Sequence, residues 1–245
     1  MKIIPLSEGK FTVDQTKRFI PFDASVNTLQ DRAAGSLLVE IQPFVVVTQK
    51  DVILLDAGLG YRLNGELQLH YNLRQAGIDP GQVTKVVFSH LHKDHMGGAV
   101  IADESGLLTS AFPHATYFIQ RAEMDFALSK QSSSFIAPVL EWLSSCAQVR
   151  WLEGTGVIDD YIQYEISGGH SPCHQSVKIV EQGVVVFYGG DEAPQLQQMK
   201  HRFVAKYDYD GKKAMELRNR WKEQGTKENW TFLFYHDVQH PTHQF

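Results

Sequence analysis

The segment His-Leu-His-Lys-Asp-His-Met-Gly-Gly, residues 90–98, decides how this sequence is interpreted. It follows KVVFS (85–89), a short apolar run typical of a buried strand. Four side chains able to bind a metal ion lie within six residues: His90, His92, Asp94 and His95. In an extended segment residues two apart point to the same side, so the first two histidines can share one ion. The aspartate and the last histidine follow a turn and can face a second ion, and imidazole and carboxylate groups suit zinc or similar ions.

Three further candidate ligands each stand directly after a run that is expected to form a strand. His170 follows YIQYEIS, Asp191 follows VVVFYGG, and His236 follows WTFLFY. Strand ends on one rim of a sheet are places where side chains distant in sequence converge. Together with residues 90–95, these positions predict a metal centre rather than a histidine-rich surface loop.

The remaining pattern predicts two sheets packed together with helices outside, an α+β fold. Apolar runs predict strands over 35–42, 44–49, 51–56, 115–120, 149–153 and 176–183. Helical spacing predicts helices over 66–76, 121–130, 135–146 and 210–224, the first stopping at Gly77 and the last capped by Asp210. The length of 245 residues and the absence of a linker predict one domain, 1–245.

Composition argues against several classes of partner. A net charge of −5 with no basic stripe does not favour nucleic acid. No window reaches the roughly 20 apolar residues of a membrane helix, and Glu8 and Asp14 follow the short N-terminal apolar stretch too closely for a signal peptide. The two cysteines, Cys146 and Cys173, are too few for a disulfide framework. We therefore expect a cytoplasmic protein that acts on a small molecule.

The ordered set His90-x-His92-x-Asp94-His95, then His170, Asp191 and His236, resembles the metallo-β-lactamase-fold superfamily of metallohydrolases. The resemblance extends from LLDAGLG (54–60) to FYHD (234–237). It implies an αββα four-layer sandwich. It also implies that His90, His92 and His170 bind a first metal ion, that Asp94, His95 and His236 bind a second, and that Asp191 bridges both.

The same resemblance implies roles for residues beside the ligands. Asp56 in the LLDAG turn resembles the family's buried aspartate, which braces the site without binding metal, although an ordinary turn aspartate fits the sequence equally well. His174 resembles a supporting histidine of related GHTPGH segments. This sequence reads GHSPCH, so Cys173 replaces a glycine at a position that does not bind metal.

The implied activity is hydrolysis of an ester or lactone bond in a small molecule. Two divalent ions, zinc by preference with manganese or iron as alternatives, would hold a bridging hydroxide, because metal binding lowers the pKa of water from about 15.7 towards 7. Asp94 is the candidate catalytic residue that would orient the nucleophile and carry its proton.

The spacing of the ligands is similar to the branch that contains N-acyl-homoserine lactonases and organophosphorus hydrolases. The segment KYDYDGKKAMELRNRW, residues 206–221, also resembles that branch. The tyrosine that lactonases place shortly after the bridging aspartate is missing, because Glu192 follows Asp191 here. Tyr207 or Tyr209 could replace it, although a packing or surface role fits these tyrosines better.

Other activities stay open. A glyoxalase II-like thioesterase would need a basic patch, for which Lys200, His201, Arg202 and Lys206 are the nearest candidates. A phosphotriester hydrolase would use the same ligands. An iron-dependent oxidoreductase of the same fold is disfavoured by the complete set of seven ligands, and a binding protein without activity would be expected to lack some of them.

The segment 121–150 could cover the site, pack against the fold or form a homodimer, and its helical spacing favours packing. The remaining histidines are expected to be surface or capping residues: His70, His114, His201, His240 and His243.

Overall fold

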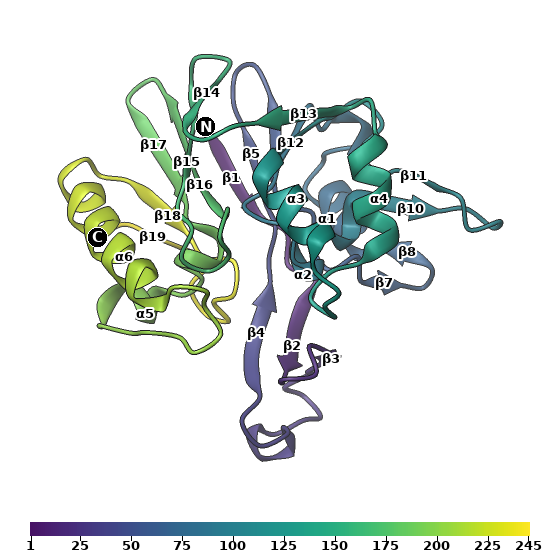
Figure 1. Cartoon of the computed structure of the whole chain (residues 1–245), viewed down its shortest axis with the longest axis horizontal. Helices are drawn as coiled ribbons and strands as arrows, with labels where there is room; N and C mark the ends of the chain where they lie inside the picture. The colour runs from purple at the N-terminus through teal and green to yellow at the C-terminus, as the bar shows by residue number, and fades with distance from the viewer.

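Two six-stranded sheets lie at the centre of the protein, whose computed structural model describes residues 1–245 (Figure 1). The first sheet has the spatial order β1 (Lys2–Pro5), β5 (Phe44–Val47), β6 (Val52–Leu55), β9 (Lys85–Val87), β12 (Thr116–Gln120), β13 (Val149–Leu152). The second has the order β14 (Gly156–Ile158), β15 (Ile162–Ile166), β16 (Gln175–Glu181), β17 (Val184–Tyr188), β18 (Thr231–Leu233), β19 (Thr242–His243).

Helices cover the outer faces of both sheets, as Figure 1 shows. Beside the first sheet lie α1 (Gln68–Gln75), α3 (Arg121–Ser129) and α4 (Ala137–Ser145). Beside the second lie α5 (Leu196–Lys200) and α6 (Gly211–Lys227). The short helix α2 (Lys93–Met96) and the 3-10 turns η1 (Leu29–Asp31), η2 (Pro80–Gln82), η3 (Gly97–Ala99) and η4 (Gly190–Glu192) lie in connections. This arrangement confirms the predicted α+β sandwich.

Successive side chains along the strands of the first sheet point to opposite faces, and each face packs in a different one of the three hydrophobic cores. Leu54 of β6 packs in the core beneath α1, α3 and α4, whereas its neighbours Ile53 and Leu55 pack in the core between the sheets. This is the period of two expected for a sheet buried on both faces. A third core lies between the second sheet and α6, around Phe187 and Trp221.

The core between the sheets joins residues from both halves of the chain. Phe44 and Val87 of the first sheet pack in the same cluster as Val177 and Tyr188 of the second. We therefore propose that the chain forms one domain. No helix in the structure is both long and apolar enough to cross a membrane.

The predicted elements of the sandwich are present, and two of their ends are defined as expected. α1 ends before Gly77, which has a φ of +79°. α6 begins after Asp210, whose carboxylate accepts a hydrogen bond from the Lys213 backbone N–H.

An arm projects from the sandwich in Figure 1, and of its three strands only the last was predicted, as the strand over 35–42. It consists of β2 (Gly9–Val13), β3 (Phe19–Pro21) and β4 (Leu37–Ile41), in the order β3-β2-β4. Strand β2 is short and pairs with β4, which lies far along the chain. Such a strand has little periodicity of its own, because it is stabilised by a long-range partner. Two further small sheets pair β7 (Arg62–Leu63) with β8 (Glu66–Leu67) and β10 (Val100–Ala102) with β11 (Leu108–Ser110).

Candidate metal centre

The segment 90–98 leaves the end of β9 and turns directly into α2. Its two glycines allow the LDAGLG turn to pack against it. A Cβ atom on Gly97 would lie 2.2 Å from the carbonyl oxygen of Leu59, and one on Gly98 would lie 2.2 Å from that of Ala57. Side chains at these positions would therefore push the two turns apart.

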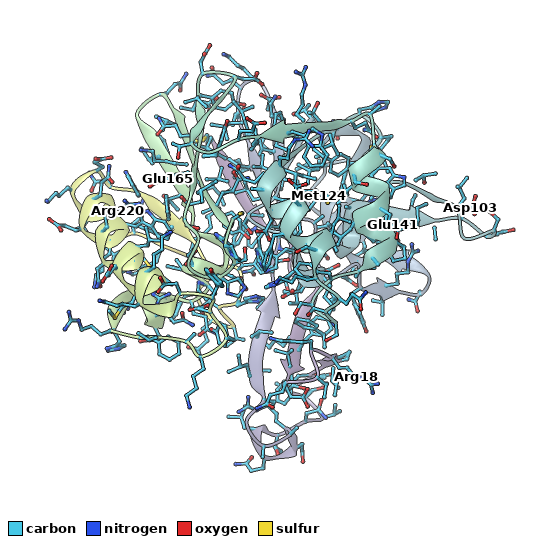
Figure 2. All side chains as sticks on the ribbon, in the orientation of Figure 1. Arg18, Asp103, Met124, Glu141, Glu165 and Arg220 are labelled. Atoms are coloured by element: carbon cyan, nitrogen blue, oxygen red, sulfur yellow. The ribbon has the colours of Figure 1, made fainter.

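The other three candidate ligands lie on loops at the ends of strands of the second sheet, as predicted. His170 lies between β15 and β16, Asp191 lies in η4 after β17, and His236 follows β18. Figure 2 labels Arg220 of α6 on the left of the molecule and Met124 of α3 to the right of it.

The structure brings His90, His92 and His170 together as one set. The Nε2 atom of His90 lies 2.9 Å from Nδ1 of His92, and Nε2 of His170 lies 3.1 Å from the same Nδ1 atom. Three imidazole nitrogens therefore lie close together, and three histidines are a common ligand set for zinc.

Asp94, His95 and His236 form a second set. Their ligand atoms lie within 4.8 Å of one another. The Asp94 carboxylate oxygen Oδ2 lies 3.5 Å from Nε2 of His236 and 3.7 Å from Nε2 of His95. All three residues are buried.

Asp191 lies between the two sets and turns one oxygen to each. Its Oδ2 atom lies 3.4 Å from Nε2 of His170. Its Oδ1 atom lies 3.3 Å from Nε2 of His95 and 3.2 Å from Nε2 of His236. This is the arrangement that a carboxylate bridging two ions requires.

Two buried polar atoms in the centre have no hydrogen-bond partner: His95 Nε2 and Asp191 Oδ1. Burying such atoms unpaired is costly, and most buried polar atoms in proteins are satisfied. A cation between these two atoms would satisfy both. The donor set and these unpaired atoms together fit a pair of divalent metal ions.

In four of the five histidines the ring nitrogen Nδ1, which faces away from the centre, is held by another group. Nδ1 of His95 lies 2.7 Å from Asp56, Nδ1 of His170 lies 2.9 Å from Asp208, and Nδ1 of His236 lies 2.8 Å from the carbonyl oxygen of Glu40. Nδ1 of His90 lies 3.0 Å from Ser89 Oγ. Such partners fix the orientation of the ring and leave the other nitrogen free to bind metal.

Asp56 has the supporting position that the resemblance implied. It is fully buried, and its carboxylate accepts hydrogen bonds from the backbone N–H and the hydroxyl of Ser89 and from the Tyr188 hydroxyl. Its φ of +57° is rare for a residue other than glycine. His174 is also buried, and its Nε2 atom accepts a hydrogen bond of 3.1 Å from the backbone N–H of Asp191.

Burial and charged neighbours shift the pKa values of the histidines in the centre, in different directions. Burial lowers the pKa of His90 and His92, and their histidine neighbours lower it further, so these imidazoles are neutral and able to bind metal. Burial also opposes the charged form of His95, but the carboxylates of Asp191, Asp94 and Asp56 raise its pKa well above the usual value.

Glu192 and Asp208 are supporting residues that the sequence did not identify. The Glu192 carboxylate accepts hydrogen bonds of 2.6 and 3.0 Å from the backbone N–H groups of Gly169 and His170. It thereby ties the Asp191 loop to the His170 loop. Glu192 could have been suspected from the sequence because it directly follows Asp191. Asp208 lies 38 residues from His170, and only the fold brings the two together.

Of the two tyrosines considered as replacements for the missing one, Tyr207 lies at the centre. Its ring centroid is 6.1 Å from that of His170, the residue is 41% exposed, and the partial burial of its hydroxyl raises the pKa of that group to about 12. Tyr209 is 71% exposed. From the segment 121–150, Phe135 also reaches the centre, with its ring centroid 5.3 Å from that of His92.

Comparison with known proteins connects this geometry to a family. The sequence model of the metallo-β-lactamase superfamily matches residues 40–236, which include all seven candidate ligands. The N-acyl homoserine lactonase AiiA of Bacillus thuringiensis subsp. kurstaki is 27% identical over 172 residues, or 68% of this chain and 61% of that protein. The matched part thus spans about three fifths of the relative's length.

Two solved structures share the fold at 20% identity. One is a probable metal-dependent hydrolase from Staphylococcus aureus, with a TM-score of 0.78, covering 99% of this chain and 91% of the other. The second is the dizinc quorum-quenching lactonase AidC with its product bound, with a TM-score of 0.73, covering 98% of this chain and 88% of the other. With the sandwich, the ligand order and the sequence match in agreement, this chain belongs to the metallo-β-lactamase superfamily.

Proposed function

We propose that this protein is a metal-dependent hydrolase that uses two divalent ions to cleave an ester or lactone bond in a small molecule. The observation that carries the proposal is the position of Asp191 between two sets of ligands, with one carboxylate oxygen directed to each. The match to the lactonase AiiA supports a lactone or ester as the bond cleaved.

The residues that would hold the ions follow from the two sets. His90, His92 and His170 would hold the first, Asp94, His95 and His236 would hold the second, and Asp191 would contact both. When bound, two such ions supply Lewis acidity that makes water a better nucleophile at neutral pH and stabilises negative charge on a carbonyl oxygen. Zinc suits a mixed site of imidazoles and carboxylates, with manganese or iron as alternatives.

Asp94 is the residue that we propose handles the proton. Its carboxylate lies 3.5 Å from Nε2 of His236, and the Tyr235 hydroxyl donates a hydrogen bond to its backbone carbonyl oxygen. The backbone is therefore fixed while the carboxylate faces the centre. A carboxylate held in this way can accept a proton from an attacking water and return it to the leaving alkoxide.

Tyr207 is the residue that we propose contacts the substrate carbonyl in place of the missing tyrosine. It lies beside His170, and its hydroxyl accepts a hydrogen bond of 3.4 Å from the Gln198 side chain. A tyrosine hydroxyl keeps its proton at neutral pH, because its ordinary pKa is about 10, and it can donate a hydrogen bond to an oxyanion.

The test combines metal content with hydrolysis. Zinc-reconstituted protein should contain two equivalents of metal and release protons from N-hexanoyl-homoserine lactone in a pH-stat. Asp94→Asn should abolish proton release, while His114→Ala, which changes an exposed histidine outside the centre, should leave it unchanged. Two bound metals with no proton release from lactones or simple esters would contradict the proposed bond type. Assays with a thioester and a phosphotriester would then identify the reaction.

A further inference from the structure

One arginine of α6, Arg218, is buried although it does not belong to the candidate metal centre. The residue is only 1% exposed. Removing a guanidinium from water costs free energy, and an apolar side chain of similar size would fill the same space without that cost. The packing of α6 against the second sheet therefore does not explain an arginine at this position.

The guanidinium of Arg218 joins two loops. Its Nη1 atom donates a hydrogen bond of 2.6 Å to the carbonyl oxygen of Glu192, and its Nη2 atom donates one to the carbonyl oxygen of Phe203. Glu192 directly follows Asp191 in η4, whereas Phe203 lies in the segment 201–210 between α5 and α6, here called the α5–α6 loop. Hydrogen bonds from a charged donor are stronger than neutral ones, so this side chain can fix the main chain of both loops.

The α5–α6 loop carries two residues of the centre. The ring centroid of Tyr207 lies 6.1 Å from that of His170, and the Asp208 carboxylate lies 2.9 Å from Nδ1 of the same histidine. Apart from Ala205 and Asp208, the residues of the loop are exposed. Burial of apolar side chains therefore stabilises the loop little, and its position depends on hydrogen bonds.

Backbone hydrogen bonds hold the far end of the α5–α6 loop. The N–H group of Tyr209 donates a hydrogen bond of 3.1 Å to the carbonyl oxygen of His170, and that of Asp210 donates one of 2.7 Å to Gly169. This end is thereby attached to the His170 loop, while Arg218 holds the near end. The two tyrosines and two aspartates of the loop thus lie between two attachments.

We propose that Arg218 is a positioning residue for the metal centre: it fixes the α5–α6 loop on the turn of Asp191 and so keeps Tyr207 and Asp208 in place beside His170. Its guanidinium contacts backbone carbonyl oxygens and takes no part in bond cleavage. For Tyr207 the inference rests on the proposed function, whereas the attachment of the loop can be tested without a substrate.

Hydrogen exchange of the Tyr209 and Asp210 amides, followed by NMR, tests the attachment. Arg218→Met keeps an unbranched side chain in the buried space and removes the donors. The two amides should then exchange at least about tenfold faster, because hydrogen bonds from a charged donor are lost. The amides of β17 should keep their rates, which separates local release from global destabilisation. Arg220→Met is the matched control, because Arg220 lies on the same helix with an exposed side chain paired with Glu165.

Arg218→Lys separates charge from geometry. Lysine keeps the positive charge, but a single ammonium lacks the planar fork that reaches two carbonyl oxygens. The exchange rates of the two amides should therefore lie between those of the wild-type protein and Arg218→Met. This variant also decides the inference if Arg218→Met does not fold. Wild-type rates in Arg218→Lys would overturn the inference, because one hydrogen bond would then suffice.

Zinc affinity and lactone hydrolysis test the consequence for the centre. Because Asp208 holds His170, Arg218→Met should weaken zinc binding, by less than the roughly 10–100-fold expected for a direct partner of a metal-binding histidine. Tyr207→Phe should reduce kcat by a smaller factor in the Arg218→Met background than in the wild-type protein. Such coupling is expected when one residue acts through the other.

Three results would count against the inference. Wild-type exchange of the two amides in Arg218→Met would overturn it, because the loop would then be held without the guanidinium. Equal zinc affinity of Arg218→Met and Arg220→Met would overturn the positioning role in the centre. Independent effects of Arg218→Met and Tyr207→Phe on kcat would overturn the part that concerns Tyr207. Absence of hydrolysis of any lactone or ester would contradict the proposed function alone, because the exchange and zinc measurements need no substrate.

Discussion

The two halves of the molecule supply the candidate metal centre in different ways. The first half provides four ligands from one continuous segment at the end of β9, residues 90–95. The second half provides three ligands from three separate loops, after β15, β17 and β18. A continuous segment keeps its ligands together through local geometry, whereas separate loops must be held to one another by other side chains.

The supporting contacts reflect this difference. In the first half, Asp56 holds both His95 and the Ser89 backbone, and glycines allow two turns to pack closely. In the second half, Glu192 ties the Asp191 loop to the His170 loop, and His174 accepts a hydrogen bond from the Asp191 backbone. The supports of the second half thus hold one loop to another.

Asp191→Ala should have the largest effect, because this residue belongs to both sets of ligands. We expect loss of both metal ions and a fall in kcat/KM greater than the roughly 10²–10³-fold that follows removal of one oxyanion donor. Metal analysis and lactone hydrolysis measure the two effects. Retention of two metal ions with normal activity would show that Asp191 does not bridge.

His92→Ala and His236→Ala compare the two sets directly. Each variant should lose about one equivalent of metal and keep the other, since the two residues belong to different sets. Metal analysis after dialysis against a weak chelator measures this, with His114→Ala as the control. Loss of both ions in each variant would mean that the two sets bind as one cooperative unit.

Asp56→Asn and Asp208→Asn compare the supports of the two halves. Both should weaken metal binding by roughly 10–100-fold, as expected for partners of metal-binding histidines. Asp56→Asn should also lower the free energy of unfolding by about 1–3 kcal/mol, because Asp56 accepts several buried hydrogen bonds. Asp208→Asn should lower it by less than Asp56→Asn does, because the Asp208 carboxylate has one side-chain hydrogen-bond partner, His170. Denaturant titration of the metal-free variants checks this, and equal destabilisation would remove the distinction between the halves.

Asp210→Ala should have the smallest effect. It removes the side-chain cap of α6 and should lower the free energy of unfolding by about 1 kcal/mol, as is typical for a helix cap. Metal content and kcat should remain unchanged, because the carboxylate faces the helix backbone. A change in metal affinity would show that the start of α6 controls the His170 loop.

The central strands of the first sheet were predicted well because they are continuous apolar runs buried on both faces. Val45 and Leu54, for example, are fully buried within such runs. The ligands of the first half could be recognised from their spacing alone. Those of the second half, such as Asp191, were recognisable only from their order after strands and their resemblance to a family.

Other features could not be predicted because they depend on long-range contacts. Asp208 has no local pattern that marks it as a partner of His170, and the fold alone brings the two together. Strands β2 and β3 of the arm also escaped prediction, since β2 is defined by pairing with β4, whose strand was predicted. The contact of Phe19 with Lys93 depends on that arm.

The most direct test of the two-ion centre is anomalous X-ray diffraction from crystals of the zinc-loaded protein. We predict two peaks about 3.5–4 Å apart, the separation usual for two-metal sites. One should lie among His90, His92 and His170, and the other among Asp94, His95 and His236, with one Asp191 oxygen directed to each. A single peak, or a second peak away from Asp191, would contradict the proposal that Asp191 joins the two halves of the centre.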